Sequence, residues 1–172
     1  MSKLRPPVNA EDQVQGSSSA TIELVEYGDY QCPHCGAAYP IIKRIQKKMG
    51  HKLKFVFRNF PLQEIHPQAL GAALAAEAAG AQNKFWQMHD IIFENQQNLQ
   101  REDLIQYAET IGLDVPTFKS DIKEQAFLEK VETDFESGIR SGVNGTPSFF
   151  IDGDKYNGSW DEKSLLEYLE NL

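Results

Sequence analysis

The sequence predicts an α/β fold: a central mixed sheet with flanking helices that carries an inserted helical subdomain. Three observations lead to this class. Residues 21–60 follow the pattern strand, helix, strand; residues 62–140 contain helical patterns with almost no strand pattern; and strand patterns return after residue 146, ahead of a last helix. A strand–helix–strand unit of this length pairs its two strands in parallel, so the sheet is expected to start from a parallel pair.

The first unit is the clearest. The segment TIELVEY, residues 21–27, is rich in apolar and β-branched residues and predicts a buried strand, and KLKFVFRNF, residues 52–60, alternates as a second strand does. Between them lies a helix that starts near Pro33 and that Gly50 is expected to end. Its apolar positions recur at helical spacing: Ala38, Ile41, Ile42, Ile45 and Met49.

The middle of the chain is predicted to be helical throughout. An alanine-rich helix is expected within residues 66–81, and an amphipathic one within residues 83–96. Residues 101–112 and 115–142 supply two or three more. We therefore assign residues 62–140 to an inserted helical subdomain.

The end of the chain is predicted to be a hairpin followed by a helix. TPSFFID, residues 146–152, is a strand pattern, and Asp152-Gly153 is typical of a two-residue hairpin turn. Ser159 and Glu162 have the spacing of a capping box ahead of the last helix. Residues 20–61 and 141–172 then form the main domain, and residues 1–19, with their Pro-Pro and Gly-Ser-Ser-Ser stretches, a flexible N-terminal arm.

The composition excludes several classes of protein. The net charge is −8, which disfavours nucleic acid and anionic membrane surfaces as partners. No apolar run approaches the roughly 18 residues of a membrane span. The first twenty residues lack the apolar core of a secretion signal, so a cytoplasmic location is expected, or an extracytoplasmic one if such a signal was removed.

Cys32 and Cys35 are the only cysteines, and they lie where the first strand gives way to the first helix. The first turn of a helix has unpaired N–H groups and a positive dipole end, which stabilise a thiolate. Pro33 suits this turn because its missing N–H is not needed there. Cys32 is expected to be the exposed nucleophile of low pKa and Cys35 the inner partner, with a protonated His34 adding charge beside the sulfur.

Other uses of the pair are less well supported. A zinc site needs about four ligands; beyond the pair the chain has only four histidines, and His51, His66 and His89 lie in no paired metal-ligand spacing. A structural disulfide across four residues would remove little chain entropy. Dithiol–disulfide exchange is favoured because the pair sits in a strand–helix–strand unit.

These residues make the chain similar to a known family. The motif Cys-Pro-His-Cys at 32–35, followed about 110 residues later by Thr146-Pro147 just ahead of a hairpin, resembles the DsbA-like thiol:disulfide oxidoreductases of the thioredoxin superfamily. The resemblance covers residues 20–172. It implies a thioredoxin-like fold, a cis peptide bond before Pro147 in a loop that holds substrate peptide, and a buried carboxylate, Glu26, beneath the cysteines.

The expected function is thiol–disulfide exchange with protein or small thiols through a mixed disulfide at Cys32 that Cys35 resolves. No cofactor or metal is expected. The partners would be protein or peptide thiols and disulfides, with a redox partner that recycles the pair. Two alternatives stay open: a thiol peroxidase, although Asp29 stands where peroxiredoxins carry Thr, and a redox-responsive binding module without turnover. An isomerase or chaperone usually needs a dimer, and because no dimerisation segment is evident a monomer is expected.

Overall fold

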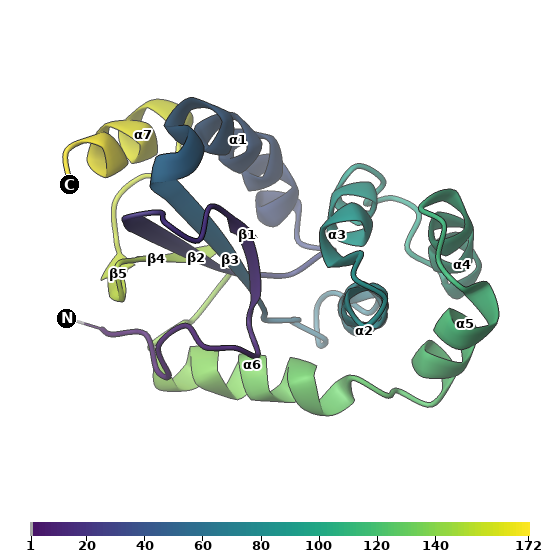
Figure 1. Ribbon diagram of the computed structural model, residues 1–172. Coiled ribbons are helices and arrows are strands. Elements are labelled where there is room, and N and C mark those ends of the chain that lie inside the picture. Colours follow the sequence, from purple (N-terminus) through teal and green to yellow (C-terminus); the bar gives the residue numbers. More distant parts are fainter. Residues whose placement is uncertain (1) are drawn as a thin grey trace.

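The computed structural model describes residues 2–172, and its centre is one mixed sheet of five strands (Figure 1). The strands lie in the order β1-β3-β2-β4-β5, with β2 and β3 parallel and every other neighbouring pair antiparallel. The predicted α/β class, with a mixed sheet and flanking helices, is therefore confirmed. The strands are β1 (Gln13–Gly16), β2 (Ile22–Gly28), β3 (Leu53–Asn59), β4 (Ser148–Ile151) and β5 (Asp154–Tyr156).

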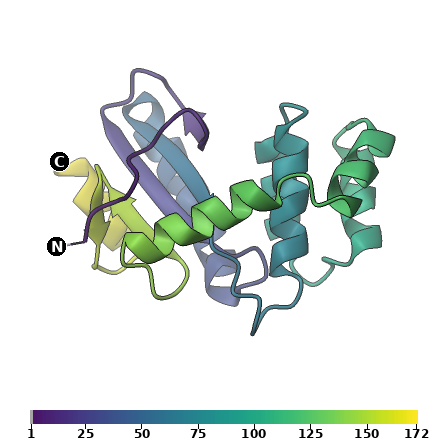
Figure 2. The same ribbon diagram turned by 90° about the horizontal axis from the view of Figure 1, so that it is seen from below.

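Helices cover both faces of this sheet (Figures 1 and 2). On one face α1 (Pro33–Met49) and α7 (Glu162–Glu170) lie side by side, and on the other α6 (Leu128–Arg140) runs across β3. The predicted apolar stripe of α1 faces the core, with Ala38, Ile42, Ile45 and Met49 buried. A short 3₁₀ turn, η1 (Gly50–Lys52), leads from α1 into β3, and Gly50 takes a positive φ of 57° there.

The remaining helices form a cluster beside the sheet (Figure 1). Helix α2 is rich in alanine and its alanines are buried, because it packs against α3, α4 and α5 as well as α6. The small side chains allow this close approach on every side. The cluster consists of α2 (Ala69–Gly80), α3 (Phe85–Phe93), α4 (Arg101–Thr110) and α5 (Val115–Lys123).

The prediction of a flexible N-terminal arm is wrong for much of its length. Residues 13–16 form β1 on one edge of the sheet, and Lys3 pairs with Asp154 on the opposite edge, beside the buried Leu4. The segment is polar, so its composition does not predict order. Its backbone nevertheless pairs with the strands at both edges of the sheet. Asp12 also neutralises the buried guanidinium of Arg58, with 2.8 Å between Oδ1 and Nε.

The end of the chain agrees with the predicted hairpin but not with the predicted capping box. Asp152 and Gly153 both have positive φ angles, 47° and 89°, as a type I′ turn requires. The last helix is capped by Asp161, whose carboxylate accepts a hydrogen bond from the backbone of Ser164, while Ser159 bonds Asp161 instead. No helix within residues 2–172 is long and apolar enough to cross a membrane.

Candidate active site

The two cysteines lie at the junction of β2 and α1, as the sequence predicts. Cys32 is the N-cap of α1, with φ −67° and ψ 124°, and Pro33 is the first helical residue. Cys35 follows within the first turn. The strand therefore delivers Cys32 to the positive end of the helix, where backbone N–H groups point toward its sulfur.

The expectation that Cys32 is exposed is wrong. Cys32 is only 4% exposed and Cys35 is fully buried, so Cys32 is the outer thiol but not an open one. The cover comes from the loop ahead of β4, where the carbonyl oxygen of Thr146 lies 3.7 Å from the Cys32 sulfur. A segment 114 positions away in sequence thus covers the Cys32 sulfur.

The surroundings of Cys32 favour its thiolate. Its pKa is lowered to about 5, chiefly because the Cys35 thiol donates a hydrogen bond to its sulfur. Burial opposes this, while Thr146 and the backbone N–H groups of Cys35 and His34 add to the lowering. His34 therefore contributes through its backbone, and its side chain is exposed to solvent.

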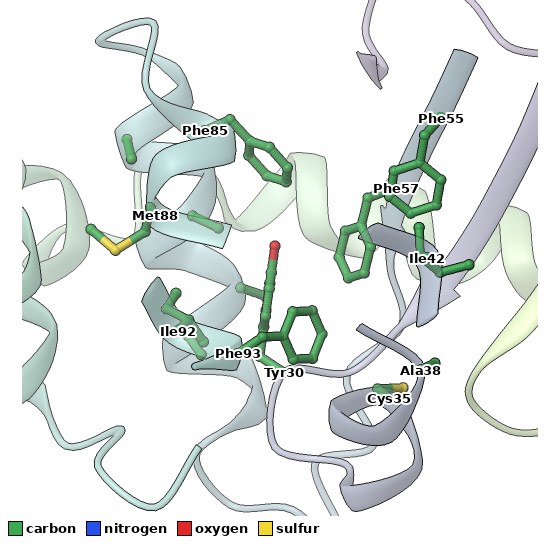
Figure 3. Packing of buried hydrophobic residues seen from close by; sticks show 14 of the residues in the cluster. Tyr30, Cys35, Ala38, Ile42, Phe55, Phe57, Phe85, Met88, Ile92 and Phe93 are labelled. Carbon is green, nitrogen blue, oxygen red and sulfur yellow. The ribbon is translucent and has the colours of Figure 1, made fainter. Parts of the chain in front are cut away.

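Cys35 has the opposite character. Burial raises its pKa well above the ordinary thiol value, and its hydrogen bond to Cys32 and the charge of Glu26 raise it further. Figure 3 shows the packing that buries it: aromatic rings of Tyr30, Phe57 and Phe93 fill the space between this end of α1 and helix α3. The pair accordingly contains one thiolate and one thiol that stabilises it.

Glu26 lies within the sheet on β2, opposite Phe57 of β3 and Phe149 of β4. It is 3% exposed, and its pKa is raised to about 8, first by burial and then by the charge of Cys32. Gly28 leaves room for it, because a Cβ at that position would come within 2.8 Å of the Glu26 carboxylate. The structure therefore provides a buried carboxyl group that titrates near neutral pH.

Thr146 and Pro147 lie in a half-buried loop, and the peptide bond between them is cis. The Thr146 hydroxyl is buried and has no hydrogen-bond partner. Because Thr146 also contributes to the low pKa of Cys32, this hydroxyl is available to donate to the thiolate. The predicted residues of the two motifs are therefore brought together from the two ends of the chain.

Three further residues hold the active-site turn, and the sequence alone does not predict this role for them. Asp29 is buried in the turn, and its carboxylate accepts hydrogen bonds from the backbone of Cys32 and from the ring of His66. The Gln96 side chain donates to the carbonyl oxygens of Tyr30 (2.8 Å) and Cys32 (3.0 Å). An Asp three residues before Cys32, at a strand end, is a recognisable turn signal, but no local pattern marks His66 or Gln96.

A shallow cleft borders this turn. Its volume is about 600 Å³, and it is lined by residues 61–65 and by Phe135 of α6. Leu62, on its wall, donates its backbone N–H to the Asp29 carboxylate at 2.9 Å. Within residues 2–172 no group of three or more His, Cys, Asp and Glu side chains is arranged to hold a metal ion.

The fold and the site together define a class: thioredoxin-type proteins with a pair of cysteines at the N-terminus of a helix. The chain belongs to the thioredoxin family, because the family model described as "Thioredoxin" matches residues 9–171. Among solved structures it is similar to oxidised BdbD from Bacillus subtilis, with a TM-score of 0.87 and 25% identity over 99% of this chain and 96% of that one. It shares its fold with the thiol-disulfide exchange protein α-DsbA2 from Wolbachia pipientis, with a TM-score of 0.83 and 23% identity over 95% and 88% of the two chains.

Curated relatives place a similar sequence inside longer proteins. A Na(+)/H(+) antiporter NhaA 1 from Mycobacterium sp. (strain KMS) is 39% identical over 169 residues, which is 97% of this chain but 28% of the antiporter. The protein called NhaA from Herminiimonas arsenicoxydans is 39% identical over 97% of this chain and 27% of its own length. This chain thus spans about a quarter of the length of these relatives.

Proposed function

We propose that this chain catalyses thiol–disulfide exchange through Cys32 and Cys35, with a mixed disulfide at Cys32 as the intermediate. The observation that carries the proposal is the opposite character of the two thiols. The pKa of Cys32 is lowered to about 5 and that of Cys35 is raised, so near neutral pH one sulfur is the nucleophile and the other holds its proton. The thioredoxin-type fold supports this class of reaction.

The reaction balances without a cofactor. The Cys32 thiolate attacks one sulfur of a substrate disulfide, the substrate S–S bond breaks, and the first thiol of the substrate leaves as a thiolate. Cys35 then loses its proton and attacks the Cys32 sulfur, which releases the second substrate thiolate and forms the Cys32–Cys35 disulfide. In the opposite direction a substrate thiolate attacks Cys32 of the oxidised pair.

Glu26 is the proposed acceptor of the Cys35 proton. A carboxyl group whose pKa is about 8 can take a proton from a buried thiol and return it near neutral pH. Its position on β2, with charge interactions to both cysteines, supports this role. The thiolate formed at Cys35 is then the nucleophile of the second step.

The substrates proposed are protein or peptide thiols and disulfides, recycled by a separate redox partner. A polypeptide bound in extended form along the Thr146-Pro147 loop would reach Cys32, since that loop already contacts its sulfur. The cleft at residues 61–65 offers additional apolar contact beside the same turn.

The test is catalysed exchange with a fluorescent peptide disulfide in a glutathione buffer. We expect turnover by the wild-type protein, none by Cys32→Ser, and single-turnover capture of the peptide by Cys35→Ser. Consumption of hydrogen peroxide, measured in parallel, should stay at the uncatalysed rate. Turnover of peroxide without peptide exchange would contradict the proposal in favour of a thiol peroxidase.

A second candidate is suggested by the curated relatives, in which the similar segment is part of an antiporter chain. In this alternative the dithiol unit acts as a redox-responsive module that contacts a membrane transporter. It would bind its partner differently in the dithiol and disulfide states but would not turn over peptide substrate. Binding measured on both states, beside the exchange assay, distinguishes the two functions.

A further inference from the structure

The Asp29 carboxylate connects the active-site turn to the loop after β3. Its side chain is fully buried, and each oxygen accepts two hydrogen bonds. Oδ1 accepts from the backbone N–H groups of Gln31 (2.8 Å) and Cys32 (3.1 Å). Oδ2 accepts from the backbone N–H of Leu62 (2.9 Å) and from Nδ1 of His66 (2.8 Å).

Asp29 also contacts the second cysteine. Its backbone N–H points at the Cys35 sulfur, 3.4 Å away, and lowers the pKa of that thiol against the larger effect of burial. One residue therefore fixes the backbone of the nucleophile with its side chain and supports the resolving sulfur with its main chain. The orientation of Asp29 decides both contacts at once.

His66 completes the arrangement from a distant part of the sequence. Its side chain is 17% exposed, on the loop between β3 and α2, and 37 positions separate it from Asp29. A carboxylate only accepts hydrogen bonds, so Nδ1 of His66 must carry a hydrogen. The ring is thereby held as a donor to Oδ2 of Asp29, whereas the backbone of Cys32 bonds Oδ1.

We propose that Asp29 and His66 are positioning residues for the second step of the exchange, in which Cys35 attacks the mixed disulfide. This inference rests on the proposed function. His66 orients the Asp29 carboxylate, the carboxylate fixes the turn, and the turn keeps the Asp29 N–H directed at the Cys35 sulfur.

The second step requires a charge on Cys35, which is why the direction of the Asp29 N–H affects its rate. Cys35 must become a thiolate in a buried site, and a fixed N–H donor stabilises that charge without reorganisation at the moment of reaction. If Oδ2 loses the His66 donor, the carboxylate can rotate and the turn can relax. The Cys35 thiolate then loses its main-chain donor, so release of the substrate slows while attack by Cys32 is little changed.

The test uses two variants that differ in where they place a donor. Asn at position 66 can put an amide N–H near the place of Nδ1, whereas Gln places it near that of Nε2. Reduced protein is mixed with oxidised glutathione, quenched with acid, and the species carrying one glutathione is followed by mass spectrometry. His66→Gln should slow the decay of this species roughly tenfold, as expected for loss of a hydrogen bond to a charged group. In His66→Asn the decay rate should return to within about twofold of the wild-type rate.

Three controls make the outcome decisive. His51→Gln changes an exposed histidine of η1 and should leave every rate unchanged. Urea unfolding separates positioning from folding: lower stability of His66→Gln with unchanged decay would overturn the proposal, as would equal decay in the Asn and Gln variants. If His66→Gln does not fold, Asp29→Asn takes its place and should slow the same decay. Formation of neither the glutathione-bound species nor the Cys32–Cys35 disulfide in wild type would refute the proposed function itself, whatever the variants do.

Discussion

The sulfur of Cys32 lies 3.7 Å from the carbonyl oxygen of Thr146, a residue 114 positions later in the chain. This contact joins the two motifs of the sequence into one site. Thr146 also acts on Cys32 in two ways: its backbone and loop cover the Cys32 sulfur, and its unpartnered hydroxyl is available to a thiolate there.

Thr146→Val tests the second role. Valine keeps the shape of threonine but removes the hydroxyl donor, so the pKa of Cys32 should rise by roughly one unit. The reduced form is then less stabilised, and the redox potential should move to a more negative value. Thiolate absorbance in the ultraviolet, titrated against pH, measures the first effect, and equilibrium with glutathione the second.

Two comparison variants sharpen this result. Thr110→Val changes an exposed threonine of α4 and should leave the Cys32 titration unchanged. His34→Ser should raise the Cys32 pKa by less than Thr146→Val, because the imidazole is exposed while the backbone N–H of residue 34 remains. A larger shift in His34→Ser would mean that the imidazole charge, expected from the sequence, is the stronger influence.

Cys35 is predicted to act on Cys32 as a hydrogen-bond donor, not only as a resolving thiol. Cys35→Ser keeps a donor in the first turn, whereas Cys35→Ala removes it. Both should accumulate mixed disulfides, but only Cys35→Ala should raise the Cys32 pKa strongly, because the Cys35 hydrogen bond is the largest cause of the low value. Identical thiolate titrations of the two variants would rule out this donor role.

Glu26 and Cys32 should have opposite effects on stability as pH changes. The folded pKa of Glu26 is raised from 4.5 to about 8. Its contribution to the free energy of unfolding is therefore complete below about pH 4.5 and is lost as pH rises through 8. The folded pKa of Cys32 is lowered from 9.0 to about 5, so its contribution is complete above about pH 9 and is lost as pH falls through 5. Between pH 5 and 8 the two groups therefore change the free energy of unfolding of the reduced protein in opposite directions, and their effects nearly cancel.

Removing one of the two groups should leave the pH dependence of stability that the other group causes. Relative to wild type, the free energy of unfolding of reduced Glu26→Gln should rise with pH by about 1.4 kcal/mol per unit between pH 5 and 8. That of Cys32→Ser should fall by a similar amount. Urea unfolding at pH 5, 6, 7 and 8 measures both, and subtracting wild type at each pH removes the other titrating groups. Parallel curves for Glu26→Gln and wild type would show that Glu26 does not titrate in this range.

The N-terminal segment is predicted to be essential to stability through one buried ion pair. Asp12→Ala leaves the guanidinium of Arg58 buried and without its carboxylate, at a cost of about 3–5 kcal/mol. Asp154→Ala, which removes the exposed pair with Lys3, should cost at most about 1 kcal/mol. Urea unfolding of both variants at pH 7 makes the comparison; equal losses would contradict the assignment of Asp12 as the critical partner.

The parts of this structure that follow local rules could be predicted from the sequence. The position of Cys32 at a helix start and the hairpin at Asp152-Gly153 depend on neighbouring residues, and the parallel β2–β3 pair follows from the order strand, helix, strand. The hydrogen bond from His66 to Asp29 could not be predicted, because it depends on how two loops meet in three dimensions.

Two of the wrong predictions have similar causes. The position of Cys32 at the helix start, with Cys35 further in, predicts an exposed Cys32 thiol, but a loop from the other end of the chain covers it. The Pro-Pro and Gly-Ser-Ser-Ser stretches predict a flexible N-terminal arm, but residues 13–16 pair with an edge of the sheet and the Asp12 carboxylate pairs with the buried Arg58. In both cases the deciding partner is distant in sequence.

The central claim is that Cys32 is the nucleophile and Cys35 the proton-bearing partner. Limited alkylation of the reduced wild-type protein tests it most directly: limiting iodoacetamide at pH 6, followed by peptide mapping with mass spectrometry. At this pH a thiol of pKa about 5 is mostly thiolate and one of raised pKa is not, so label should appear on Cys32 with at least roughly tenfold preference. Equal labelling of the two cysteines, or labelling of Cys35 first, would contradict the account.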